Sequence, residues 1–283
     1  MHFPASGVEC AWWIPPVVAF GLAMLTAPAG ISGAFLLLPF QMSVLGFVSP
    51  AVTPTNLIFN TVAIPGGVYR YIRERRMVWP VAFAIRLGTL PGVFAGALIR
   101  TRKLPDPRSC KLFVAGVLLY MGVRLLSSRP DAPACGGAVV GASSISVHRI
   151  DYEYGGEKFS LNPAALVALA LVVGVVGGIY GVGGGAIIAP YLMAILGLPA
   201  YTVAGAALVG TFVTSIAGVA GFAVLGQMPD WRLGLLFGAG GFAGSYWGAR
   251  LQKRLPERWI RLLVAVLVLA ISGAYTAQFF VAI

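Results

Sequence analysis

The chain has 283 residues, of which 58% are hydrophobic and only 10% are charged, whereas roughly a quarter of the side chains in a soluble domain are charged. This composition excludes a soluble globular protein, because too little polar surface is available to face water. The net charge of +11 does not indicate nucleic-acid binding, since the basic residues lie in short connections between apolar segments, where membrane topology explains them.

The first half consists of apolar segments separated by proline, glycine or basic residues. We predict five helical segments there, at residues 12–27, 33–47, 52–71, 78–99 and 111–126. The first run lacks the basic flank and cleavage pattern of a signal peptide, so we expect it to be retained as a helix. Residues 1–126 are therefore the first predicted transmembrane repeat.

Residues 127–162 differ from the segments on either side, because they contain prolines, glycines and an alternating apolar run. The alternation from Ile145 to Tyr154, followed by Gly155-Gly156, predicts an extramembrane linker with a β-hairpin. A regulatory lid and a plain connector between two halves are both compatible with this pattern.

The second transmembrane repeat, residues 163–283, has the arrangement of the first. We predict helical segments at 163–179, 184–198, 203–225, 233–249 and 259–282. The apolar stretches 161–198 and 260–283 exceed the roughly 18 to 20 residues that cross a bilayer. The sequence thus predicts an all-α polytopic protein that spans the cell membrane several times.

An internal duplication relates the two halves. The run from Gly30 to Pro39 recurs 151 positions later, from Gly181 to Pro190. After a one-residue slip, the glycines at 88, 92 and 96 correspond to those at 240, 244 and 248. We therefore expect two homologous halves.

Loop charges bear on the orientation of the two repeats. If all five segments of each half cross, thirteen basic residues fall on one side of the membrane and six on the other. If the glycine-led segments 33–47 and 184–198 are re-entrant, ten basic residues fall on one side of the membrane and nine on the other. The positive-inside rule therefore favours inverted repeats of five segments each, with four crossings per half as the alternative.

Glycines interrupt the apolar pattern at corresponding places in the two halves. Non-helical backbone at membrane depth is tolerated where it is buried in protein or lines a cavity, and a helix that starts there presents N–H groups that favour an anion. Close helix packing is the alternative role of these glycines. Residues expected at the breaks as substrate ligands are Gly30, Ser32, Gly33, Gly181, Gly183, Gly184 and Gly185.

Polar side chains lie within the third segment of each half. Asn56 and Asn60 are one helical turn apart, and Thr211 lies 151 positions after Asn60. Amide and hydroxyl groups can replace part of the water shell of an oxyanion, whereas hydrogen bonds between helices are their structural alternative. The residues expected to bind substrate are Asn56, Asn60, Thr211, Thr214 and Ser215.

Arg86 is the basic residue that lies well inside a predicted span. A charge within the membrane generally marks function, and a guanidinium suits a sulfonate or carboxylate. We therefore include Arg86 in the expected site, with extension of its side chain toward the membrane surface as the alternative.

The chemistry that the sequence lacks is also informative. All nine acidic residues fall in predicted loops or termini, and the chain has only two histidines. We therefore expect no enzyme activity, no metal site and no cofactor. An anion that leaves the cell needs no coupling ion, because a potential that is negative inside supplies about 2.3 kcal/mol per charge per 100 mV.

The duplicated Gly-x-x-Gly-x-Gly-Gly-Gly…Pro segment, whose second copy spans Gly178 to Pro190, resembles that of the TauE/SafE family of membrane permeases. The resemblance extends over nearly the whole chain, including the tyrosine and arginine that precede Trp79 and the spaced glycines. It implies an exporter of sulfite, sulfoacetate or a similar organosulfonate.

We therefore expect a transporter that works by alternating access, with one half rocking against the other around a small anionic substrate. A passive anion channel and a permease for another small organic anion are the alternatives. The expected partners are the substrate and the lipid bilayer, without nucleic acid, and a homodimer is left open.

Overall fold

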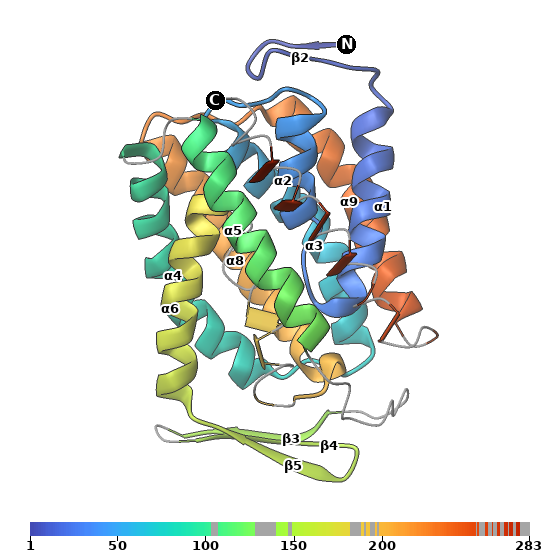
Figure 1. The fold of residues 1–283 in the computed structure, drawn as a ribbon. Coiled ribbons are helices and arrows are strands. Elements are labelled where there is room, and N and C mark those ends of the chain that lie inside the picture. The colour runs from blue at the N-terminus through green and yellow to red at the C-terminus, as the bar shows by residue number, and fades with distance from the viewer. Residues whose placement is uncertain are drawn as a thin grey trace.

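A computed structural model describes most of the chain (Figure 1). The described residues are 1–102, 107–127, 140–146, 149–181, 188–189, 191–192, 196, 198–252 and 254, followed by 258–259, 262, 265–266, 269–270, 272–273 and 276–277. The predicted segments 184–198 and 259–282 therefore lie only partly within the described residues.

Helices make up most of the described structure. In chain order they are α1 (Ile14–Thr26), the 3-10 turn η1 (Ala27–Ala29), α2 (Ala34–Ser43), α3 (Val52–Arg73), α4 (Trp79–Arg102), α5 (Pro107–Ser127), α6 (Pro163–Tyr180), α8 (Ala200–Val224) and α9 (Trp231–Leu251). The predicted segment 33–47 is shorter as a helix, because the chain turns back after Ser43 and the Phe47 amide donates to the Gln41 carbonyl at 2.9 Å.

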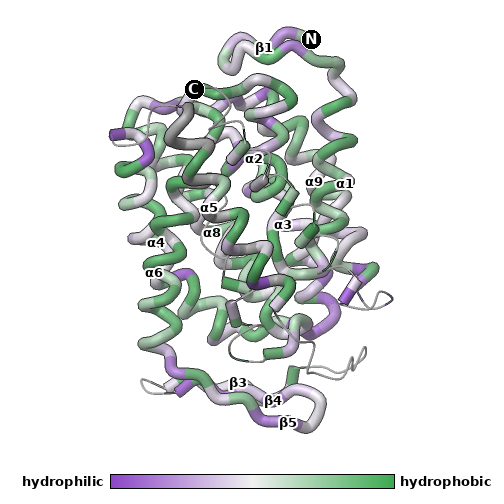
Figure 2. Tube along the Cα trace, viewed as in Figure 1, coloured by the Kyte–Doolittle hydropathy of each residue, from purple (hydrophilic) through white to green (hydrophobic). Residues whose placement is uncertain are grey.

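Two helices, α4 and α8, are both long enough and apolar enough to cross a bilayer, and α1, α2 and α6 contribute shorter apolar helices. Figure 2 shows hydrophobic residues along the length of the bundle, while the hydrophilic residues gather near its two ends. A helix that is apolar around its whole circumference is typical of a membrane span.

The chain is mostly helical, but an all-α fold is not confirmed, because the chain also forms strands. Strands β1 (His2–Phe3) and β2 (Val8–Glu9) make an N-terminal hairpin, and β3 (Val140–Ile145), β4 (Ile150–Tyr154) and β5 (Glu157–Leu161) form an antiparallel sheet in that order. The turn between β4 and β5 is Gly155-Gly156, with φ angles of 62° and 86°. Two positive φ angles characterise the tight hairpin turn that glycine favours.

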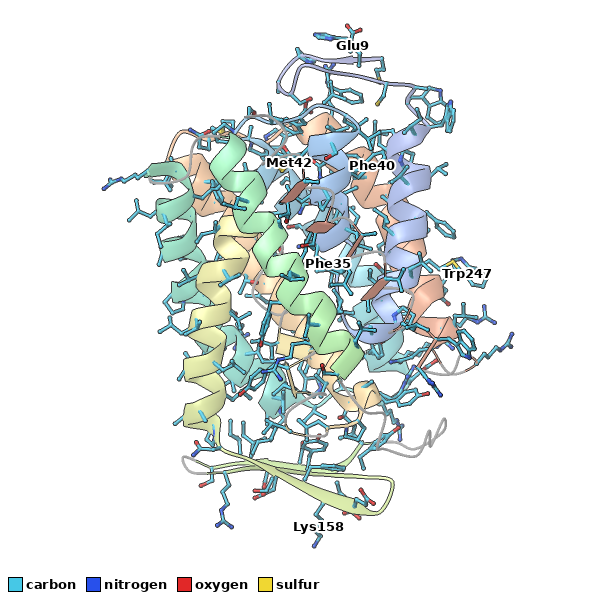
Figure 3. The ribbon with its side chains drawn as sticks, in the orientation of Figure 1. Glu9, Phe35, Phe40, Met42, Lys158 and Trp247 are labelled. Atoms are coloured by element: carbon cyan, nitrogen blue, oxygen red, sulfur yellow. The ribbon has the colours of Figure 1, made fainter. Side chains whose placement is uncertain are left out.

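The hairpin and the sheet cover opposite ends of the bundle, as Glu9 and Lys158 show in Figure 3. At one end the Asp230 carboxylate accepts hydrogen bonds from the hydroxyl and the amide of Ser6 at 2.7 and 3.1 Å. At the other end the Tyr152 hydroxyl lies 3.2 Å from that of Thr202, at the start of α8. Both coverings are thus tied to the helices by polar contacts.

Helices of the two halves pack against each other through spaced glycines. Helix α4 contacts α6, and α9 contacts α1. A Cβ atom at each glycine would meet a carbonyl oxygen of the facing helix, so only glycine permits this approach. The contacts are Gly88, Gly92 and Gly96 with Val167, Leu171 and Val175, and Gly240, Gly244 and Gly248 with Pro16, Phe20 and Met24.

These two sets of contacts involve corresponding positions, since the residues on α6 follow those on α1 by 151 and the glycines on α9 follow those on α4 by 152. In Figure 1, α1 begins at the end covered by the N-terminal hairpin, whereas α6 begins at the end covered by the sheet. Corresponding helices therefore begin at opposite ends of the bundle.

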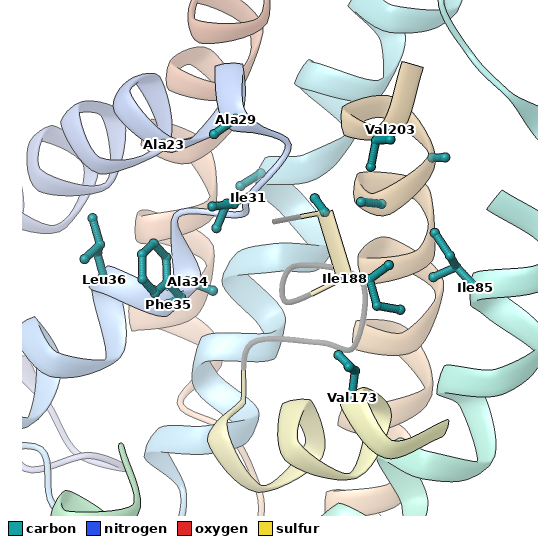
Figure 4. Close-up of a cluster of buried hydrophobic side chains, with 14 of the residues drawn as sticks. Ala23, Ala29, Ile31, Ala34, Phe35, Leu36, Ile85, Val173, Ile188 and Val203 are labelled. Carbon is teal, nitrogen blue, oxygen red and sulfur yellow. The ribbon is translucent and has the colours of Figure 1, made fainter. Parts of the chain in front are cut away.

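The apolar core contains side chains from both halves. Figure 4 shows Ile31 and Phe35 from the first half and Val173, Ile188 and Val203 from the second, which belong to one cluster of buried hydrophobic residues. All five are less than 8% exposed. The segment that joins α1 to α2 is thus embedded in the protein.

Candidate functional site

The first helix break follows α1. After the turn η1, Gly30 has a left-handed backbone with φ of 71°, and α2 begins at Ala34 with Gly33 as its N-cap. A Cβ atom at Gly30 would collide with the backbone of Ala204 on α8. Both the left-handed angle and the close approach require glycine here.

The second break follows α6, where Gly181 has φ of 73°. A Cβ atom there would lie 2.9 Å from the Thr53 carbonyl oxygen on α3. The two contacts correspond, because Gly181 and Ala204 follow Gly30 and Thr53 by the same 151 positions. Each break therefore rests on a helix of the other half. The predicted ligands Gly183, Gly184 and Gly185 lie outside the described residues.

Asn56 on α3 links the two breaks. Its amide nitrogen donates to the Ala34 carbonyl and to the Gly181 carbonyl, both at 2.9 Å. Its amide oxygen accepts a hydrogen bond from the side-chain nitrogen of Gln41 on α2, at 3.1 Å. Asn56 and Gln41 are fully buried. One side chain thus connects α2, α3 and the end of α6.

Several buried polar side-chain atoms have no hydrogen-bond partner among the described residues. They include the hydroxyl oxygens of Ser32 and Ser215 and the side-chain carbonyl oxygen of Gln41. Buried polar atoms are nearly always paired in folded proteins, by protein, water or ligand. These atoms are therefore suited to receive a solute.

The pairing of α3 with α8 relates Asn60 to the polar residues of the second half. A Cβ atom at Gly67 would contact Leu208, and one at Gly218 would contact Leu57. The two helices are therefore antiparallel. Because Gly67 faces Leu208 and Leu57 faces Gly218, the same pairing places Asn60 at the height of Ser215. The bundle thus brings these two predicted ligands to the same level of adjacent helices.

Thr211 and Thr214 are fully buried on α8. Their hydroxyls donate to the carbonyls of Ala207 and Gly210 at 2.9 and 2.8 Å, within the same helix. Such local bonds already use the hydroxyl protons. The Ser215 hydroxyl, by contrast, has no hydrogen-bond partner among the described residues.

Arg86 does not lie beside the other predicted ligands in the bundle. Its guanidinium lies 4.8 Å from the ring centroid of Phe83, a side chain that is 49% exposed. The outward face of α4 carries both residues, which fits the alternative of a side chain that extends toward the membrane surface.

Arg100 is a buried basic residue that the sequence analysis did not include in the site. It is 0% exposed, and its Nε donates to the Thr53 hydroxyl at 3.4 Å. Because Thr53 also contacts Gly181, the Arg100 side chain lies at the second break. The sequence contains a signal for this position, since Arg100 continues the four-residue spacing of Gly88, Gly92 and Gly96.

Gln252 continues the corresponding spacing after Gly248 and lies at the first break. Its side-chain nitrogen donates to the Pro28 carbonyl at 2.6 Å, and its oxygen accepts from Arg76 at 2.7 Å. Arg76 also pairs with Glu74. Burial lowers the pKa of Arg76, an effect that the nearby Tyr71 opposes. Each helix break therefore has a buried guanidinium nearby.

Among the described residues, no group of three histidine, cysteine or acidic side chains is placed to hold a metal ion. The helices α1 to α6, α8 and α9 contain no acidic residue. A cavity of about 180 Å³ lies where β5 meets α6, lined by residues such as Leu161, Leu166 and Tyr191, but no predicted ligand borders it.

Comparison with known proteins gives two matches. The family model described as "Sulfite exporter TauE/SafE" matches residues 16–275. The chain is 21% identical over 252 residues to "Probable membrane transporter protein YunE" of Bacillus subtilis (strain 168), an alignment that covers 86% of this chain and 89% of that protein. No solved structure matches the chain.

Proposed function

The chain belongs to the sulfite exporter TauE/SafE family of membrane transporters, and from this premise we propose that it exports a small sulfur-containing anion across the cell membrane. Sulfite, sulfoacetate and similar organosulfonates are the proposed substrates. The family name supports the sulfur chemistry, and the lack of acidic residues in the described helices supports an anionic solute.

The observation that carries this proposal is the polar set around Asn56, which joins the two helix breaks inside an apolar bundle. We place the acid group of the substrate near the Arg100 guanidinium, at the second break. Arginine binds oxyanions such as carboxylates and phosphates through two parallel hydrogen bonds, and two oxygens of a sulfonate can be bound in the same way; the hydroxyls of Ser32 and Ser215 can donate to further oxygens. Gly30, Gly33 and Asn60 remain proposed ligands.

Alternating access is the proposed mechanism, in a scaffold of two inverted repeats with five segments each. The corresponding contacts of α4 with α6 and of α9 with α1 support this arrangement. So do the opposite ends at which α1 and α6 begin (Figure 1). A scaffold with such symmetry can close around a site from either side.

The end covered by β3, β4 and β5 is the proposed cytoplasmic end. Basic residues are more numerous there, including Arg70 and Arg73 in the last turn of α3, Arg76 after it, Arg250 in the last turn of α9 and Arg254 after it. Cytoplasmic loops of membrane proteins carry such an excess. An anion that leaves from this side moves with the membrane potential.

Efflux from proteoliposomes loaded with sulfite or sulfoacetate tests the proposal. We expect saturable efflux that shows counterflow, because a carrier exchanges solute whereas a channel does not. Arg100→Gln should reduce efflux about 10- to 100-fold, as expected for the loss of a buried charged hydrogen bond, and Arg100→Lys should have a smaller effect.

Arg86→Gln is the matched control, because it removes the same charge from the outward face of α4. It should leave efflux near the wild-type level. Size-exclusion chromatography of each variant checks that the protein remains folded. Wild-type efflux in Arg100→Gln, with loss of efflux in Arg86→Gln, would exclude the proposed site and restore the sequence-based one.

A further inference from the structure

The side-chain oxygen of Gln41 is a hydrogen-bond acceptor without a partner. Gln41 is 0% exposed, and no described residue donates to this oxygen. The atom lies on α2, one hydrogen bond away from Asn56 and therefore next to the residue that joins the two helix breaks.

The orientation of the Gln41 amide follows from its neighbours. Asn56 contacts two backbone carbonyls, Ala34 and Gly181, which can only accept hydrogen bonds, so its nitrogen must face them. Its oxygen consequently faces Gln41, which must present its own nitrogen. The carbonyl oxygen of Gln41 is thereby left as the atom that needs a donor.

An oxyanion cannot satisfy this atom, because the oxygens of a deprotonated acid group only accept hydrogen bonds. We propose that the transported solute carries a hydroxyl or ammonium group close to its acid group, and that the Gln41 side-chain oxygen accepts a hydrogen bond from it. Among the organosulfonates proposed above, the site would then favour hydroxy- or aminoalkanesulfonates over sulfoacetate, which carries no such donor. This inference rests on the proposed function and makes Gln41 a specificity-determining residue.

The two kinds of polar group at the breaks fit such a solute. Arg100 and the hydroxyls of Ser32 and Ser215 can donate to an acid group, whereas Gln41 accepts. A site with both kinds of group distinguishes a hydroxylated solute from its deoxy analogue, since only the former pairs the buried acceptor.

Two probes of nearly equal size, 2-hydroxyethanesulfonate and ethanesulfonate, test this inference. Binding to the purified full-length protein is measured by thermal stabilisation over a range of ligand concentrations. We expect the hydroxylated probe to bind about 3- to 10-fold more tightly, the gain from one net hydrogen bond. Equal affinities would overturn the inference, because the oxygen would then be satisfied by water.

The variant Gln41→Met removes the acceptor while keeping an unbranched side chain. It should bind both sulfonates with equal affinity, whereas Thr61→Val, which removes a hydroxyl elsewhere on α3, should keep the wild-type preference. A preference that survives in Gln41→Met would overturn the assignment. The comparison of the two probes on the wild-type protein needs no variant and stands if Gln41→Met does not fold.

A second pair, 3-hydroxypropionate and propionate, separates the two proposals. Binding of the hydroxylated carboxylate without binding of either sulfonate would contradict the sulfonate substrate while supporting the acceptor role of Gln41. Equal binding of both sulfonates would contradict the role of Gln41 and leave sulfonate export intact. Absence of binding by all four probes would overturn the role of Gln41, and absence of sulfite and sulfoacetate efflux as well would overturn both proposals.

Discussion

The substitution Asn56→Leu tests whether the hydrogen bonds between the two helix breaks hold the bundle together. Leucine has nearly the size of asparagine but makes none of its three hydrogen bonds. The Ala34 and Gly181 carbonyls and the Gln41 nitrogen would all remain buried without a partner. At about 1 to 3 kcal/mol for each unpaired group, and with partial relaxation, the expected loss is about 3 to 6 kcal/mol of unfolding free energy.

Thermal unfolding of the purified protein in detergent measures this loss. A decrease in melting temperature on the order of 10 °C is expected for Asn56→Leu. Thr61→Val serves as the control, because the Thr61 hydroxyl bonds only to the Leu57 carbonyl of its own helix, at 2.9 Å. It should lower the melting temperature by a few degrees at most. Equal melting temperatures for the two variants would falsify the role assigned to Asn56.

Three further predictions concern packing and the two ends of the bundle. Gly92→Val should destabilise the protein, because its side chain would meet the backbone of α6, whereas Gly116→Val should be tolerated, since no atom lies within 4 Å of a Cβ there; expression and melting temperature report both. Asp230→Ala should release the N-terminal hairpin, because Ser6 loses both of its hydrogen bonds to the carboxylate, and faster proteolysis near residue 6 would show this. Burial raises the pKa of Tyr152 to about 12 from its ordinary 10. The neutral Tyr152 side chain therefore contributes its full share of the unfolding free energy below pH 10, and this share is lost as pH rises toward 12. Tyr152→Phe should remove this loss from the unfolding free energy measured at alkaline pH.

The helices could be predicted from the sequence because hydrophobic runs and their Pro, Gly or basic boundaries are local signals. The predicted segment 163–179 and helix α6 (Pro163–Tyr180) agree within one residue. The N-terminal hairpin was missed, because strands of two residues are too short to show an alternating pattern. Strand β3 was missed for another reason, since its sequence of small and polar residues, VGASSI, lacks the alternation of β4.

Only part of the candidate site could be predicted from the sequence. The one-turn spacing predicts that Asn56 and Asn60 share a helix face, but not that the Asn56 partner is the carbonyl of Gly181, 125 positions away. Arg100 was assigned to a basic loop because helix α4 was predicted to end at residue 99, whereas it continues to Arg102. The four-residue spacing after Gly96 was the signal that could have corrected this assignment. Gln41 stands alone in an apolar run, so no pattern singled it out.

The way in which the halves pack limits what can move as a unit. Helix α4 is joined to α6 through glycines that permit no gap, and α9 is joined to α1 in the same way. A motion that separated residues 1–126 from 163–283 would have to pull both interfaces apart. In a cycle of the proposed alternating-access kind, each rigid body would therefore combine helices from both residue ranges, so that neither fragment, expressed alone, would contain a complete moving body.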